Sequence, residues 1–307
     1  MAFEDSDLYG GIAGAELPVD AFDLGHGVVL SKTYAHLMAP FMMAFTPAPP
    51  GKHHPAPWRA AKGGFSFDIV AQIHIPSDFS VSDWFDKLNT IWWLAALLRF
   101  RAAHSVTIPV VASDAFAKGR ETEGIEFWPI EIDPQRLHMI VKPSIMLEDG
   151  LCWVRDHWID AGRLLQQSKQ FNLLFQSLDQ TLFARNTSLA FLSLWAALEA
   201  MFSPARSELR FRVSANIAAY LEKPGPRRSA LQKSTAKLYD ARSAVAHGTS
   251  QREDPAFKGT YDLVRRVLIR ILSQNHVPTR DELERMLFGI EDEEEPEASN
   301  PGIGAEQ

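Results

Sequence analysis

The chain has 307 residues, which is long enough for two domains and for a sizeable buried core. Its formal net charge of −7 at pH 7 argues against a general nucleic-acid binder, although the charge is unevenly distributed. Cys152 is the only cysteine, so an internal disulfide and a cysteine-rich zinc site are both excluded, and a reducing compartment fits.

The start of the chain lacks the pattern of a secretion signal. Residues 1–7 contain acids where a signal peptide needs a basic start followed by an apolar run. The longest apolar run, residues 91–98, is closed by Arg99 and Arg101 and is far too short to span a bilayer. We therefore expect a cytoplasmic protein without membrane contact.

The first half of the chain has the pattern of strands mixed with one helix. Ser82 or Asp83 is a suitable N-cap for a helix that has a broad apolar face and ends near Arg101. The proline-rich residues 46–58 predict a loop. The Glu-Asp-Gly segment 148–150 marks the end of a predicted α+β domain of residues 1–149. β-branched or alternating runs predict strands at residues 27–34, 65–75, 106–112, 125–132 and 137–145.

The second half has helical spacing, which predicts an all-α bundle over residues 150–290. Pro255 is at the favoured first position of a helix, and Thr279 with Glu282 predicts a capping box. The acidic residues 291–307 include too few apolar side chains to fold and are predicted to be disordered. Helices are expected at residues 153–185, broken near Gly162, and at residues 188–202, 207–222, 229–247, 254–273 and after Thr279.

The helix predicted at residues 229–247 has two different faces. Leu231, Leu238 and Val245 recur every seven residues and form an apolar stripe that must face a core. Ser243 lies four residues from Tyr239 and four from His247, so these polar side chains form a second stripe that points away from the core.

Arg242 flanks the polar stripe of this helix. Arg242 and His247 are about 140° apart around the helix axis, with a shallow polar groove between them. A histidine near a helix end titrates near neutrality, and an arginine is always charged and has a fork that matches phosphate oxygens. The pair could therefore cleave RNA without a metal: a base takes the proton of a ribose 2′-hydroxyl, which attacks the adjacent phosphate.

The segment Arg242-Ser-Ala-Val-Ala-His247 resembles the motif of HEPN domains, in which four to six residues separate an arginine from a histidine. The flanking Leu-Tyr-Asp-x-Arg-Ser and His-Gly resemble the ApeA-like branch of this superfamily. Residues 194–200 and 209–215 resemble the two preceding helices of the family. The resemblance covers residues 170–275 and no part of the first half. It implies a homodimer that pairs the motif helices. Because Arg242 and His247 point in different directions, one motif covers an RNA phosphate poorly, whereas two facing copies can surround it.

Glu199 is the only charged residue in an otherwise apolar segment, and a buried carboxylate needs a partner. Arg210, Arg212 or Arg242 could supply it. A pair with Arg242 would hold that guanidinium in position for phosphate, whereas a purely structural pair with Arg212 is slightly favoured.

Other side chains could support the motif. Ser243 can hydrogen-bond His247, and Tyr239 could stack on a base, line the dimer interface or pack in the core. Basic residues outnumber acidic ones between residues 206 and 280, so Arg210, Arg212 and Lys237 are candidate RNA contacts.

These patterns together predict an α+β protein whose HEPN-like helical bundle is a metal-independent endoribonuclease without a cofactor. The resemblance implies a role in anti-phage defence or a toxin-like role. The N-terminal domain would then be a sensor or restraint that binds a regulatory ligand or protein. One alternative is a non-catalytic HEPN-like module that binds RNA, a nucleotide or a protein. Another is a helical dimerisation domain that serves an N-terminal ligand-binding function.

Overall fold

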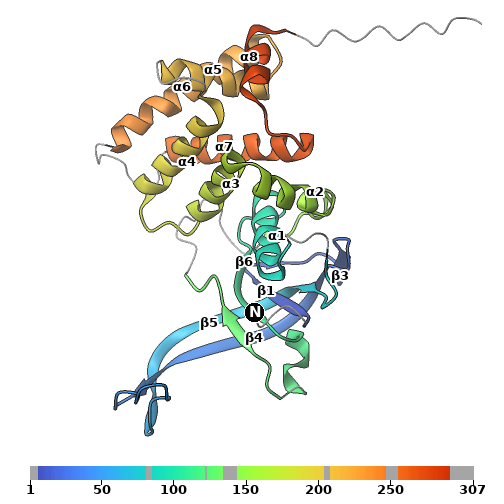
Figure 1. Cartoon of the computed structure of the whole chain (residues 1–307), viewed down its shortest axis with the longest axis vertical. Helices are drawn as coiled ribbons and strands as arrows, with labels where there is room; N and C mark the ends of the chain where they lie inside the picture. Colours follow the sequence, from blue (N-terminus) through green and yellow to red (C-terminus); the bar gives the residue numbers. More distant parts are fainter. Residues whose placement is uncertain are drawn as a thin grey trace, which may run out of the picture.

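The computed structural model describes residues 6–80, 85–121, 123–133, 144–203, 208–246 and 255–290, without the side chains of residues 120 and 243–246. An antiparallel sheet dominates the N-terminal part, and helices form the rest of the described chain, as Figure 1 shows. The predicted α+β class is therefore confirmed. The predicted tail of residues 291–307 lies outside the described residues.

The main sheet has six strands in the order β3-β4-β5-β1-β6-β7, and each neighbouring pair is antiparallel. α1 (Lys87–Arg101) packs on one face, and the short 3-10 helix η1 (Phe116–Arg120) packs on the other. A separate parallel pair joins β2 to β8. The strands are β1 (Leu8–Ala13), β2 (Ala15–Glu16), β3 (Ala21–Asp23), β4 (Val29–Ala44), β5 (Trp58–Ile75), β6 (Thr107–Ala112), β7 (Phe127–Pro129) and β8 (Ser144–Ile145).

The central strand β1 was not predicted, because its Leu-Tyr-Gly-Gly-Ile-Ala sequence has two glycines, which are poor strand formers. Both glycines are needed for close packing. A Cβ on Gly10 would lie 2.7 Å from Cγ2 of Ile91 in α1, and a Cβ on Gly11 would lie 2.6 Å from Cζ of Phe116. Consecutive strand residues point to opposite faces, so these contacts bring α1 and η1 close to the two faces of β1.

Two of the predicted strands are much longer than the sequence pattern indicated. β4 has 16 residues and β5 has 18, and the pair extends well beyond the rest of the sheet (Figure 1). The predicted loop between them is confirmed as residues 45–57, because pairing continues out to Ala44 and Trp58. The predicted strand at residues 125–132 shortens to β7, and most of the one at residues 137–145 lies outside the described residues.

The helical part follows the predicted order, with two corrections. The break in the first long helix is at Ser168 rather than Gly162, because Ser168 caps the next helix by accepting a hydrogen bond from the Phe171 amide. α1 has Asp86 as its N-cap, rather than Ser82 or Asp83. The helices are α2 (Glu148–Gln167), α3 (Lys169–Thr181), α4 (Thr187–Phe202), α5 (Leu209–Leu221), α6 (Pro226–Ala246), α7 (Pro255–Gln274) and α8 (Arg280–Phe288).

Two helix starts agree closely with the sequence. α7 begins at Pro255, and Thr279 and Glu282 form the predicted capping box of α8. Within the described ranges, no helix is both long enough and apolar enough to cross a membrane.

One hydrophobic core runs through the sheet and the helices. α2 packs directly against the end of α1, because a Cβ on Gly150 would lie 2.7 Å from Cα of Ala102. The buried Trp158 of α2 donates its indole hydrogen to the Leu24 carbonyl at 2.8 Å. Residues 148–150, where the sequence indicated a domain boundary, therefore lie at a tightly packed contact.

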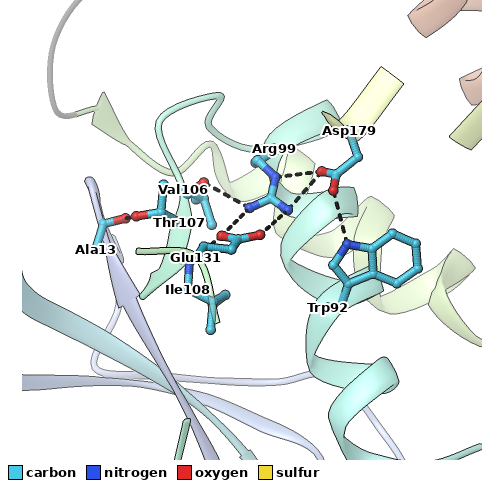
Figure 2. Close-up of polar contacts among 8 residues, drawn as sticks. All are labelled: Ala13, Trp92, Arg99, Val106, Thr107, Ile108, Glu131 and Asp179. Atoms are coloured by element: carbon cyan, nitrogen blue, oxygen red, sulfur yellow. Dashed lines mark hydrogen bonds and ion pairs between the residues drawn. The ribbon is translucent and has the colours of Figure 1, made fainter. Parts of the chain in front are cut away.

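A buried arginine links the sheet and the helices (Figure 2). Arg99 of α1 is fully buried, and its guanidinium contacts Asp179 of α3 at 2.8 Å and Glu131, which follows β7, at 2.9 Å. Trp92 donates to the other Asp179 oxygen at 3.1 Å. Burial alone would lower the pKa of Arg99, but attraction to Asp179 and Glu131 outweighs it and raises that pKa.

Candidate functional site

The motif helix α6 is positioned by its neighbours α5 and α7. It begins at Pro226, whose ring suits the first turn, and ends at Ala246 near the periphery of the helical part (Figure 1). Leu231 and Leu238 pack partly buried against the core, as the apolar stripe predicted. A Cβ on Gly259 of α7 would lie 3.0 Å from the Leu238 side chain, so the two helices approach closely there.

Part of the predicted motif cannot be placed. His247 and Gly248 lie outside the described residues, as do the side chains of Ser243 and Val245. The backbone of α6 is described up to Ala246, and His247 is the next residue in the sequence.

Three predicted residues, Glu199, Tyr239 and Arg242, are in direct contact. Nη1 of Arg242 donates to Glu199 Oε1 in a short ion pair and to the Tyr239 hydroxyl oxygen at 2.9 Å. The Tyr239 hydroxyl donates to the same Glu199 oxygen at 2.8 Å. The guanidinium carbon of Arg242 also lies 5.4 Å from the centre of the Tyr239 ring, which is within cation–π range. We refer to these three side chains as the Glu199 cluster.

The Glu199 cluster lies between the core and the solvent. The Arg242 side chain is 29% exposed and that of Glu199 is 20% exposed. The fully buried Trp195 meets the Tyr239 ring edge to face, with the ring centres 5.0 Å apart. Burial, followed by the hydrogen bond to Glu199, raises the pKa of Tyr239, so its hydroxyl remains a donor at neutral pH.

Comparison of the chain with protein families, curated proteins and solved structures finds no match. Functional inference therefore depends on the sequence pattern and on the geometry of the cluster.

The geometry separates Arg210 from the Glu199 cluster. Arg210 of α5 forms a two-pronged ion pair with Asp240 of α6, at 2.5 and 2.7 Å. The hydrogen bond to Asp240 raises the pKa of Arg210, and the same bond lowers that of Asp240. Both side chains are more than half exposed, so this pair contributes little to stability. A phosphate would have to compete with Asp240 for this guanidinium.

Arg212 lies elsewhere, in the wall of a cleft of about 610 Å³. The cleft lies between the ends of α2 and α4 and the helices α5 and α8, and Arg280 and Glu284 of α8 also line it. Glu199 pairs with Arg242, and no ion pair between Glu199 and Arg212 occurs among the described residues. The arginine that the sequence slightly favoured as the partner of Glu199 therefore does not fill that role.

Lys237 is exposed on the surface of α6, one turn from Asp240. It is thus open to a ligand but is not part of the cluster. The sequence reasoning missed Trp195 and Asp240. The sequence did contain a signal for Trp195. It lies four residues before Glu199 on the same helix, and side chains at this spacing share a helix face.

Proposed function

We propose that this protein is a metal-independent endoribonuclease of the HEPN type, and that Arg242 and His247 act on the RNA phosphate. The observation that supports it most is the placement of Arg242. Its guanidinium is held by Glu199 and Tyr239 but stays partly exposed, five residues before the motif histidine. A cation held in advance of the reaction stabilises developing charge better than a freely moving one.

In this proposal, His247 and Arg242 divide the chemistry. An imidazole removes the 2′-hydroxyl proton, and the resulting oxygen attacks the adjacent phosphorus while the 5′ oxygen leaves with a proton supplied by an acid. The products are a 2′,3′-cyclic phosphate and a 5′-hydroxyl. Arg242 offsets the charge that builds up on the phosphate oxygens, and Glu199 and Tyr239 act on RNA only through Arg242.

Two copies of the chain would form the working enzyme. α6 ends near the periphery of the helical part, so a second copy could reach the end of the helix that precedes His247 (Figure 1). A composite site would place one arginine and one histidine on each side of the scissile phosphate. Its biological role, by resemblance, is defence against phage or a toxin-like activity.

One observation favours a second candidate, a non-catalytic module that binds RNA or a protein. Arg242 already has a carboxylate partner, and structural arginines are commonly paired in this way. Such a module would bind its partner through α6 but would leave RNA intact.

The deciding experiment incubates the full-length protein with end-labelled single-stranded RNA in excess EDTA. Wild type is compared with Arg242→Ala and His247→Ala, with Arg185→Ala as a matched control, because Arg185 is an exposed arginine that pairs only weakly with Asp133, at 3.4 Å. We expect cleavage by wild type and the control and its loss in both motif variants. Cleavage that survives in both motif variants would contradict the proposal.

A further inference from the structure

The paired strands β4 and β5 form an extension that we call the arm, residues 34–68. β3 pairs with β4 only at residues 29–31, and β1 pairs with β5 only at residues 71–75. Beyond those positions the two strands pair only with each other among the described residues. The paired part from Tyr34 to Ala44 is about 35 Å long, at about 3.3 Å per residue. Figure 1 shows the arm at the end of the molecule opposite α5, α6 and α8.

The arm exposes more large apolar side chains per residue than the rest of the described chain. Of the 19 large apolar side chains that are exposed in the described chain, eight lie in the arm. A bulge between Pro40 and Met42, opposite the positive-φ glycines Gly63 and Gly64, shifts the register, and apolar side chains occupy both faces beyond it. The eight are Tyr34, Met38, Phe41, Met42, Met43, Phe45, Trp58 and Phe65.

A two-stranded ribbon with apolar side chains on both faces is poorly stable in water by itself. Its large side chains would remove about 1,000 Å² from solvent if they were covered, given that one aromatic side chain buries about 150–250 Å². A stable interface between proteins needs about 800 Å² from each partner. The apolar surface of one arm is therefore sufficient for a stable dimer.

The charge of the arm indicates what kind of surface would cover it. The arm, residues 34–68, has three cations, Lys52, Arg59 and Lys62, and one acid, Asp68, at its base. The whole chain has a charge of −7 and the arm has a charge of +2, so the rest of the chain, which we call the body, has a charge of −9, of which the acids of residues 291–307 supply −7. The arm of one copy is thus electrostatically attracted to the body of another copy.

We propose that the arm packs against the body of a second copy of this chain and forms a protein interface. RNA fits less well, because methionines make up three of the eight exposed side chains and cannot stack on bases as aromatic rings do. The arm itself lies at the end of the molecule away from α6 (Figure 1), so its packing does not depend on the proposed nuclease activity and would be additional to a contact between motif helices.

The experiment measures self-association of the full chain by sedimentation velocity from 1 to 100 µM. The test variant is Met38→Ser/Phe41→Ser/Phe45→Ser, whose three side chains are all more than half exposed, so the fold should persist. The control is Ile145→Ser/Leu173→Ser/Phe288→Ser, which removes exposed apolar side chains elsewhere. We expect the test variant to associate at least 30-fold more weakly than wild type, and the control to be unchanged, because apolar anchors dominate interface energies.

A second variant tests the charge argument without removing apolar surface. Lys52→Glu/Arg59→Glu/Lys62→Glu should weaken association at least tenfold, since it places acids against an acidic body. Wild type that stays monomeric to 100 µM, or arm variants that associate like wild type, would overturn the proposal. An arm variant that associates like wild type but no longer binds a 20-nucleotide RNA, or anionic lipid vesicles, would also overturn the proposal. That ligand would then be the partner of the arm. Association through the arm should be measurable in wild type even if no cleavage of RNA is ever detected.

Discussion

Glu199 determines where Arg242 lies. Its carboxylate accepts hydrogen bonds from both Arg242 and Tyr239, and it is the only charged residue of α4. The sequence indicated that Glu199 needs a partner but left three arginines open, because spacing along a chain does not show which helices meet. The choice of Arg242 follows from the packing of α4 against α6, which brings Glu199 close to residues 239–242.

Replacing Glu199 with glutamine keeps the size of the side chain but removes its charge. We expect Glu199→Gln to lower cleavage about 10- to 100-fold per folded molecule, because a loosely held guanidinium is misplaced relative to the phosphate. Single-turnover rates with saturating RNA would measure this. If Glu199→Gln only lowers the midpoint of urea unfolding and leaves those rates unchanged, the positioning role is wrong.

Tyr239 contributes both a hydroxyl and a ring. Tyr239→Phe removes the two hydrogen bonds but keeps the contact with Trp195, so we expect a loss of about 1 kcal/mol in the free energy of unfolding and less than a tenfold loss in cleavage. Tyr239→Ala also removes the ring and should cost about 3 kcal/mol or more. Urea unfolding of the two variants separates these contributions, and equal losses would show that the ring contributes nothing.

At the scale of elements, strong local signals made some helices predictable. The capping box at Thr279, the proline that starts α7 and the apolar α4 act within a few residues, so the sequence alone locates these helices. Strand β1 and the outer half of the arm were missed. In β1, glycines are required by contacts with Ile91 and Phe116, which lie far away in the sequence. In the arm, pairing continues past Pro40 without the alternation that marks a half-buried strand.

The ion cluster of Arg99 joins three elements that are distant in sequence. Arg99→Met leaves the buried Asp179 and the largely buried Glu131 without their cation, and we expect a loss of about 3–5 kcal/mol in the free energy of unfolding. Trp92→Phe removes only one neutral donor to Asp179 and should cost about 1 kcal/mol.

Urea denaturation followed by tryptophan fluorescence would measure the Arg99→Met effect, with circular dichroism for the Trp92 variant. An Arg99→Met protein as stable as wild type would show that the cluster does not hold the sheet to the helices. Replacing all three charged residues with apolar ones of similar size should recover much of the loss, because the cost arises from unpaired charges.

At the scale of the whole molecule, the contact between the end of α1 and α7 makes stability depend on pH. Burial, and then the nearby Arg265, lowers the pKa of His104 to about 4. The unfolded chain binds a proton at this histidine near pH 6.5, whereas the folded chain binds it only near pH 4. The contribution of His104 to the free energy of unfolding is therefore fully present above pH 6.5. It falls as the pH decreases towards 4, by on the order of 2–3 kcal/mol in total.

His104→Asn should flatten this dependence. We expect the free energy of unfolding of wild type to fall more steeply between pH 7 and pH 4.5 than that of the variant, as measured by urea titrations at both values. Other groups titrate equally in both proteins, so the difference between the two slopes reports on His104. Parallel curves would show that His104 is not buried in its neutral form.

The overall architecture also shows how far sequence reasoning extends. The α+β class, the order of the helices and the need of Glu199 for a partner were accessible, because periodicity and an isolated charge are local signals. The shared core through both halves, the Arg210–Asp240 pair and the position of Arg212 in a separate cleft depend on which elements meet in space.

The most direct test of the proposed function uses one RNA in two forms, identical except that the second has 2′-deoxyribose at the cleaved position. The full-length protein is incubated with each in excess EDTA, and the product ends are identified by mass spectrometry. The proposal predicts a 2′,3′-cyclic phosphate and a 5′-hydroxyl from the first RNA and no cleavage of the second. Cleavage of the deoxy-substituted RNA at that position, or products with a 5′-phosphate, would contradict attack by the 2′-hydroxyl and with it the assigned roles of Arg242 and His247.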